Sequence, residues 1–285
     1  MAHNLQVRYS ALVDAKLRAS LVTKDHVIFN TRYDGNPTAG AVKIPVRDGE
    51  VVVQDYNRTT GVELTNGDTG YLNVLINKDK AVNELIDGYE AAAVPDNLVA
   101  DRLDSAGYST AAAIDADALQ VLGTAHTATY ASDDPRYGKK ATTAKESGKP
   151  FEDVTNAGEA LDLAHVPVEG RYVIVSPSFY KAILNDKDNF IKKGDLSQEI
   201  VASGAVGEIG GFTVYRSAKL PTGVSAVFGH PDFATRVDVW SVPVHLQDLA
   251  GSGKFIGASA VQGRMVYGHA ITKPQAFHVL TKAAA

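Results

Sequence analysis

The chain has 285 residues, 45% hydrophobic and 21% charged, a composition typical of a folded protein with one large domain or two smaller ones. It contains no cysteine, which excludes disulfides, thiolate metal sites and a cysteine nucleophile. The net charge of −5 is uneven: residues 1–47 carry seven bases and three acids, or +4, so the remainder carries −9. An acidic body is not typical of a nucleic-acid-binding surface, and no apolar run reaches the ~18 residues of a membrane span.

Residues 1–40 are expected to form an arm. One short amphipathic helix is predicted there by the spacing of its apolar residues, which are Tyr9, Leu12, Val13, Leu17 and Leu21. The segment 30–37 is turn-rich and contributes little to a core. The positive charge of the arm suits contact with a polyanion or an acidic partner; the alternative is a solvated helix face followed by a loop. The N-terminus shows no secretory signal, which, with the lack of cysteine, suits a reducing cytoplasm.

Residues 41–78 are expected to form a long, extended β-hairpin. Apolar residues alternate over 42–46 and again over 72–76, and an Asn-Gly pair at 66–67 is a strong turn signal. The intervening stretch 54–60 is polar and offers few core residues. Such a hairpin has too few apolar residues to form a core of its own, so it is expected to pack against a neighbour. The alternative is a loosely packed meander within one domain.

Two helices are expected next. In residues 79–93, four apolar residues recur in phase with a helix. A much longer helix is predicted from Pro95 to Leu122, because proline and an acidic residue suit its first turn and Gly123 suits its end. It would be roughly 40 Å long, which suits a spine across which other elements pack, although an ordinary long core helix remains the alternative.

The remainder of the chain reads as an α/β segment followed by strands. Residues 124–153 are polar and are interpreted as an insertion loop. The expected helices are at 159–164, 178–184 and 196–202, with a short helical turn at Pro231. The expected strands are at 172–175, 212–215, 226–228, 237–240, 242–246, 254–271 and 276–280.

The usual signatures of catalysis are missing. The chain has no nucleophile elbow, P-loop, dinucleotide fingerprint or His-Glu-x-x-His motif, and its eight histidines have no metal-ligand spacing. Asp115 and Asp117 lie two apart on the long helix, so they are expected to point to different faces, and they lack the other residues of a calcium loop. We therefore predict no enzyme activity, no cofactor and no metal.

Three short motifs, together with the order of the elements, carry a resemblance to a known family. The segments 173–184 and 207–217, followed by Lys219-Leu220-Pro221, are similar to the strand-Ser-Pro-helix turn, the Gly-x-Ile-x-Gly-Phe strand and the turn after it in tailed-phage major capsid proteins. The chain thus resembles capsid proteins of the Hong Kong 97-type fold, in detail closest to those of long-tailed actinobacterial-type phages. The resemblance covers nearly the whole chain.

The resemblance implies an α+β fold with named parts. Residues 1–40 would be the N-terminal arm and 41–78 the extended loop that lies over a neighbouring subunit. Residues 79–124, with the spine helix, and the return strands 237–285 would form the peripheral domain, and 125–236 the axial domain.

The resemblance also implies a major capsid protein that self-assembles, as pentamers and hexamers, into an icosahedral head shell enclosing double-stranded DNA without sequence-specific binding. Its place would be the virion, after assembly in the host cytoplasm, with the portal and a decoration protein as further partners and no membrane. Because the arm begins at Met1 without a coiled-coil scaffolding segment, a separate scaffolding protein is expected. No covalent cross-link is predicted, because no catalytic acid can be identified beside Lys43 or Lys78.

On this interpretation the hairpin supplies the intersubunit contacts. Its charged residues of both signs are the candidates: Arg47, Asp48, Glu50, Asp55, Arg58, Glu63 and Asp68. Two other functions remain open at this stage. An encapsulin-type nanocompartment shell shares the fold, and a soluble enzyme with an unrecognised site belongs to a different class.

Overall fold

The computed structural model describes residues 16, 18–23, 27–33, 40–47, 50–51, 53–64, 69–93, 97–185, 205–250 and 253–282. Within these residues the helices are α1 (Gly88–Ala93), α2 (Leu98–Gly123), α3 (Pro150–Leu163) and α4 (Pro177–Asn185), with 3-10 turns at Pro231–Phe233 and Pro274–Ala276. The strands are β1 (Ala41–Val46), β2 (Gly70–Leu75), β3 (Lys78–Asp87), β4 (Thr142–Lys145), β5 (Tyr172–Val175), β6 (Ala205–Ile209), β7 (Phe212–Arg216), β8 (Val224–Gly229), β9 (Ala234–Asp248), β10 (Ala258–Ile271) and β11 (His278–Thr281).

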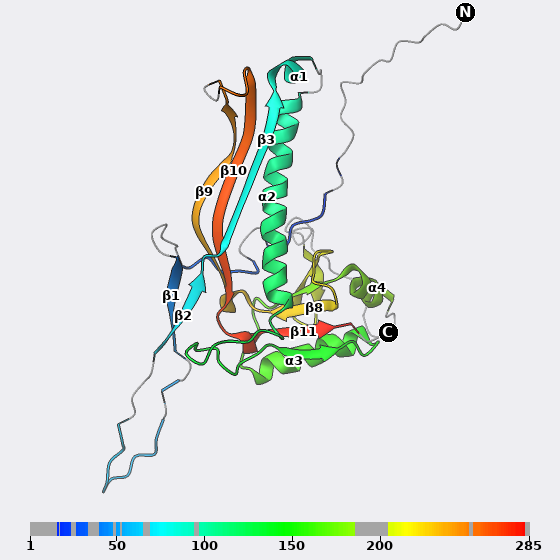
Figure 1. The fold of residues 1–285 in the computed structure, drawn as a ribbon. Coiled ribbons are helices and arrows are strands. Elements are labelled where there is room, and N and C mark those ends of the chain that lie inside the picture. Colours follow the sequence, from blue (N-terminus) through cyan, green and yellow to red (C-terminus); the bar gives the residue numbers. More distant parts are fainter. Residues whose placement is uncertain are drawn as a thin grey trace, which may run out of the picture.

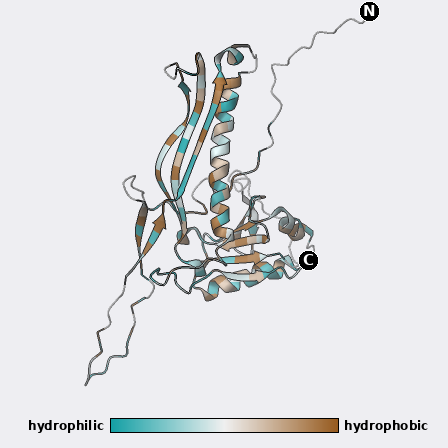
Figure 2. Ribbon diagram, viewed as in Figure 1, coloured by the Kyte–Doolittle hydropathy of each residue, from teal (hydrophilic) through white to brown (hydrophobic). Residues whose placement is uncertain are grey.

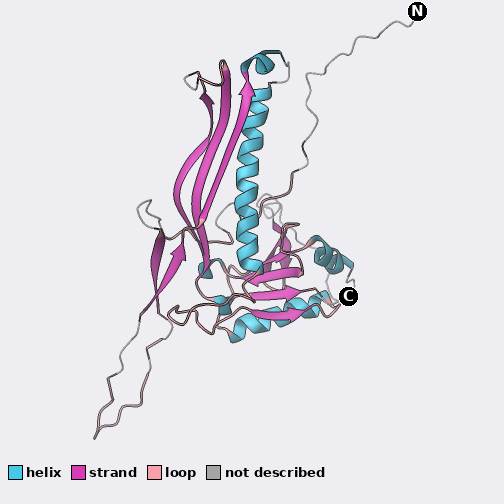
Figure 3. Ribbon diagram, in the orientation of Figure 1, coloured by secondary structure: helices cyan, strands magenta, loops and turns pink. Residues whose placement is uncertain are grey.

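The strands form two main sheets and a separate hairpin. A long, narrow sheet of order β3-β10-β9 runs beside α2, and a six-stranded sheet of order β4-β11-β8-β5-β7-β6 lies at one end of that helix with α3 and α4 (Figure 1). The paired strands β1 and β2 project to one side. Helices and strands are therefore mixed without regular βαβ alternation, as Figure 3 shows, and the fold is α+β.

The helix expected at 79–93 is largely wrong. Residues 78–87 form β3, which pairs with β10 over ten residues from Lys78↔Tyr267 to Asp87↔Ala258, and only 88–93 are helical. In β3 the residues facing α2 are more buried than those facing away, and Ile86 is the most buried. Long-range pairing with a 14-residue strand outweighs the helical spacing of four apolar residues.

The long spine helix is confirmed from Leu98 to Gly123; its expected start at Pro95 lies outside the described residues. Its 26 residues span ~39 Å. Near its beginning, Leu103 and Ala106 pack with Ile86 and Val261 of the narrow sheet. Its other end contributes to a different core, through Ala118, Leu119 and Leu122. Figure 2 shows hydrophobic and hydrophilic residues mixed along α2, as expected for a helix that packs on one side. None of the described helices is long and apolar enough to cross a membrane.

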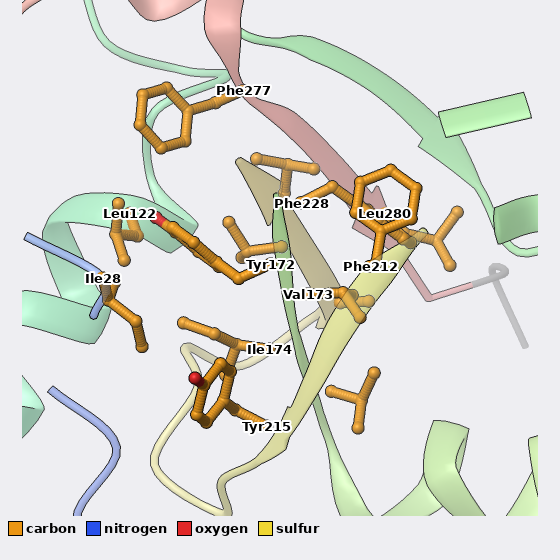
Figure 4. Close-up of a cluster of buried hydrophobic side chains, with 14 of the residues drawn as sticks. Ile28, Leu122, Tyr172, Val173, Ile174, Phe212, Tyr215, Phe228, Phe277 and Leu280 are labelled. Carbon is orange, nitrogen blue, oxygen red and sulfur yellow. The ribbon is translucent and has the colours of Figure 1, made fainter. Parts of the chain in front are cut away.

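The main core lies in the six-stranded sheet. Strand β5 is buried at all four residues, and Tyr172 contacts a cluster with Phe212, Phe228 and Leu280 (Figure 4). Leu122 of α2 and Ile28 of the arm enter the same cluster. These contacts hold three separate parts of the chain together.

Several element boundaries differ from the sequence expectations. The loop expected over 124–153 contains β4, and the helix expected at 159–164 begins at Pro150, where proline suits the first turn. The two strands expected over 237–246 are one strand, β9. The last strand, β11, pairs with β8 and β4, so the closing strands are divided between the two sheets. The expected helix at 196–202 lies outside the described residues.

The base of the hairpin is well packed. Strands β1 and β2 pair from Ala41↔Leu75 to Val46↔Gly70. The alternation expected over 42–46 and 72–76 is confirmed there, because Ile44, Val46, Leu72 and Val74 are buried against Val237 and Ala270. Val51 and Val53, which follow β1, belong to no strand. The lack of a core therefore applies to the far part of the loop, not to its base.

Candidate interaction surfaces

The loop beyond β1 is the first candidate surface. It extends far from both sheets (Figure 1), and the pairing of Asn57 with Gly61 closes its tip. Large apolar side chains on it are exposed, Val53 at 94% and Leu64 at 102%, together with Val51, Tyr56 and Val62. Exposed apolar residues that are gathered on one projection commonly mark an interaction site.

The charged residues predicted from the hairpin lie on this same loop. Arg47, Glu50, Asp55, Arg58 and Glu63 are all exposed, and within the described part of the chain none of them makes an ion pair. Asp48 and Asp68 lie outside the described residues. Among the described residues, these five charged groups therefore have no ion-pair partner, and no two of them pair with each other.

The arm makes a second surface by running along the spine helix. Lys16 Nζ lies 2.7 Å from Asp101 Oδ1, and Arg18 pairs with Asp104. Arg18 also lies over the ring of Tyr108, whose hydroxyl donates a hydrogen bond of 3.0 Å to the carbonyl of Ala19. The hydrogen bond from Arg18 lowers the pKa of Asp104. The helix expected around residues 9–21 lies mostly outside the described residues, and 18–21 belong to no helix.

The arm then passes a buried aspartate and joins the narrow sheet. Asp115 Oδ1 accepts hydrogen bonds of 3.0 Å from the backbone N–H groups of Val22 and Thr23. Further along, the N–H of Asn30 donates to Ala234 O at 2.8 Å, and the N–H of Arg236 donates to Asn30 O at 2.9 Å. Sequence reasoning missed this docking; the short apolar run before Asn30 was the available signal.

Asp117 faces the other side of the helix, as the sequence predicted. It accepts a hydrogen bond of 2.8 Å from the hydroxyl of Tyr267, and the ammonium groups of Lys78 and Lys80 lie 3.6 and 3.4 Å from its oxygens. Burial raises the pKa of Asp117, but the hydrogen bond from Tyr267 and the two lysines outweigh it and lower the pKa overall. The start of β3 is thereby tied to the spine helix.

His278 is buried and His269 is half-buried, and both pack against aromatic rings. His269 lies between the rings of Phe29 and Tyr267, and His278 contacts Phe228 and Thr142. Burial lowers the pKa of both histidines to about 4. No group of three or more histidine, aspartate or glutamate side chains that could hold a metal occurs among the described residues.

An open groove of about 560 Å³ lies along α3. Its polar lining includes Asp162 and Arg171, which already pair with each other at 2.7 Å. The hydroxyl of Thr155 on the same lining donates a hydrogen bond of 3.0 Å to Glu152 O within its own helix.

Comparison with known proteins identifies the class. Residues 89–280 match a family model described as phage capsid protein, which is more than half of the chain. The chain therefore belongs to the phage capsid protein family. No curated protein matches it.

Solved structures support the same fold. A chain of Mycobacterium phage Che8 is similar with a TM-score of 0.71 and 18% identity, over 97% of this chain and 96% of that one. A chain from the capsid of cyanophage P-SCSP1u is similar with a TM-score of 0.74 and 16% identity, over 98% and 93%. A chain from the capsid of a native GTA particle gives 0.68 and 13%, over 98% and 96%. The expected Hong Kong 97-type capsid fold is confirmed, and the family match favours a phage capsid over a nanocompartment shell or an enzyme.

Proposed function

We propose that this chain is the major capsid subunit of a tailed phage and that its extended loop holds neighbouring subunits together in the head shell. The observation that carries the proposal is the loop of residues 50–51 and 53–64, whose apolar side chains are exposed and join none of the cores formed by the described residues. Burying them against another copy would stabilise contacts by roughly 25 cal/mol for each Å² of apolar surface removed from water.

The parts of the subunit follow from the same proposal. The narrow sheet with α2 corresponds to the peripheral domain, and the six-stranded sheet, with β11 included, corresponds to the axial domain whose tips would meet in pentamers and hexamers. Residues 16, 18–23 and 27–33 are the described part of the N-terminal arm. The role is structural, because the chain belongs to a family of capsid proteins.

The remaining partners are those that a head shell needs. A separate scaffolding protein, a portal and a decoration protein would act on the assembled shell, and double-stranded DNA would be enclosed without sequence-specific binding. The excess of acids outside residues 1–47 supports this last point, because an acidic surface repels phosphates. Assembly would take place in the host cytoplasm and the product would be the virion.

The exposed charges of the loop are proposed to set its register on the neighbour. Exposed ion pairs contribute only ~0–1 kcal/mol each, yet the contact repeats in every subunit of the shell. Charge complementarity acts mainly on specificity and on the rate of association. Arg47, Glu50, Asp55, Arg58 and Glu63 are the described residues that would make these pairs.

The test separates assembly from folding. In the variants Val53→Asp, Leu64→Asp and Arg58→Glu, we expect the thermal unfolding temperature of the isolated subunit to stay unchanged, because these side chains are exposed. Assembly into shells, followed by light scattering and negative-stain microscopy, should be lost in the two aspartate variants and impaired in Arg58→Glu. Val168→Asp, at an exposed apolar site outside the loop, is the matched control. Normal shells from all three loop variants would overturn the proposed contact.

A further inference from the structure

Asp115 is a buried carboxylate in the middle of the spine helix. It is 1% exposed, and its Oδ1 atom accepts three hydrogen bonds of 3.0 Å, from the N–H groups of Val22 and Thr23 and from the hydroxyl of Thr23. All three donors belong to the arm. The same oxygen therefore fixes the register in which the arm lies on the helix.

The second oxygen of Asp115 faces a different segment. Asp115 Oδ2 is buried without a hydrogen-bond partner among the described residues, and Lys219 Nζ lies 3.6 Å from it. Lys219 belongs to the turn of residues 217–223 that joins β7 to β8, and its ammonium group also donates to Ala112 O at 3.0 Å. The two oxygens of one side chain thus hold the arm and this turn.

The turn also contacts the end of the spine helix directly. A Cβ atom at Gly123 would lie 2.6 Å from Cγ of Pro221, so the backbone of the helix and the proline ring are closely packed. Lys219 and Pro221 therefore mark where the six-stranded sheet holds the second half of α2. No described polar contact of Lys219 reaches the arm: its partners are Ala112, Asp115 and Ser217.

A buried charge makes its partners depend on one another. An isolated buried carboxylate is costly, and both the arm donors and the lysine reduce that cost. If Lys219 is lost, the Asp115 carboxylate beneath the arm has less compensation for its charge. If the arm is lost, Lys219 pairs with a carboxylate that is open to water. Groups that share one buried partner in this way show non-additive effects when they are changed together.

Space for movement lies beside the carboxylate. A cavity of about 160 Å³ is lined by Leu21 and Thr23 of the arm, by Ala111 and Asp115 of the helix, and by Arg236 of β9. The described residues before Val22, which are 16 and 18–21, are more exposed than Val22 and Thr23. Val22 packs in the main core, so the arm enters the interior at the point where it meets Asp115.

We propose that Asp115 couples the docking of the arm to the packing of the spine helix against the turn 217–223. When Lys219 is in place, the arm is held; when the helix shifts on the turn and Lys219 withdraws, the arm is released. The inference concerns the chain itself and does not depend on shell assembly. It would hold for a subunit in any oligomeric state.

Hydrogen exchange of backbone amides, followed by mass spectrometry on the full-length chain, tests the coupling. We expect Lys219→Met to speed exchange in residues 18–23 by at least about fivefold, although none of the lysine's described hydrogen bonds or ion pairs is to these residues. Conversely, Thr23→Val should speed exchange in residues 217–223. Lys16→Met is the matched control: it removes the ion pair with Asp101 and should leave the turn 217–223 unchanged.

A double change separates coupling from general destabilisation. In an Asp115→Asn background, Lys219→Met should add less than about twofold to the exchange of residues 18–23, because the shared charge is already absent. Unchanged arm exchange in Lys219→Met would overturn the proposal. So would equal effects of Lys219→Met in the two backgrounds, because the lysine would then act on the arm by another route.

Discussion

Tyr267 of β10 and Asp117 of the spine helix are joined by a hydrogen bond of 2.8 Å between side chains 150 residues apart. Tyr267 is fully buried, and burial is the first cause that raises the pKa of its hydroxyl, followed by the hydrogen bond to Asp117. Lys78 and Lys80 of β3 pair with the same carboxylate. Asp117 thereby links α2 to β10 and β3, two strands of the narrow sheet.

Tyr267→Phe is expected to destabilise the subunit by about 1–2 kcal/mol, because it removes a hydrogen bond to a charged acceptor while the ring stays in place. Denaturant unfolding of the isolated subunit measures the change. Tyr89→Phe is the control, since Tyr89 is 83% exposed, and should have no measurable effect. Equal stability of the two variants would show that the lysines alone satisfy Asp117.

Two glycines of the spine helix should respond in opposite ways to alanine. At Gly123 the new Cβ would meet Pro221 at 2.6 Å, whereas at Gly107 nothing lies within 4 Å. We expect Gly123→Ala to cost about 1–3 kcal/mol through overpacking, despite the better helix propensity of alanine. Gly107→Ala should instead stabilise by about 0.5–1 kcal/mol. Thermal unfolding of both variants measures the two changes. A stabilising Gly123→Ala would show that the turn 217–223 shifts to accept the new methyl group at little cost.

Acid should destabilise the subunit through its buried histidines. Burial lowers the pKa of His278 from 6.5 to about 4, so between these values the unfolded chain binds more protons than the folded one. The stability that the neutral form provides is complete above pH 6.5 and is lost as the pH falls toward 4. A shift of this size corresponds to at most about 3 kcal/mol.

The variant His278→Gln tests this assignment. It should lower stability at neutral pH, because it disturbs the contacts with Thr142 and Phe228, and it should flatten the decline of the unfolding free energy between pH 6.5 and 4. His165→Asn is the control: His165 is exposed and has φ 56°, a backbone conformation that asparagine tolerates. An unchanged acid slope in His278→Gln would assign the pH dependence to other groups.

Proline in the middle of the spine helix should prevent folding. Ala113→Pro removes a backbone hydrogen bond and clashes with the preceding turn, at a cost of ~3 kcal/mol or more, in the element that joins both cores. We expect insoluble protein on expression. Asp133→Ala, on an exposed turn, should stay within ~0.5 kcal/mol of the parent. A soluble Ala113→Pro subunit that assembles normally would contradict the role given to α2.

Local patterns located many elements correctly, and the reasons are visible in particular residues. Tyr172–Val175 is a short apolar run and became a fully buried strand, and Pro177 begins the helix that its position predicted. The alternation of Ile44 and Val46 set which face of β1 is buried. These features depend on neighbours in the chain, so the sequence is sufficient to find them.

The sequence by itself determined the spine helix, most strands of the six-stranded sheet, the opposite orientation of Asp115 and Asp117, and a resemblance that led to the right family. Only the tertiary structure decided that residues 78–87 are a strand, that β11 belongs with β8, and that the arm docks on Asp115. Each of these depends on partners at least 50 residues away, through strand pairing or hydrogen bonds to a buried charge. Such contacts outweigh local propensity because they bury surface and satisfy polar groups that no nearby residue can reach.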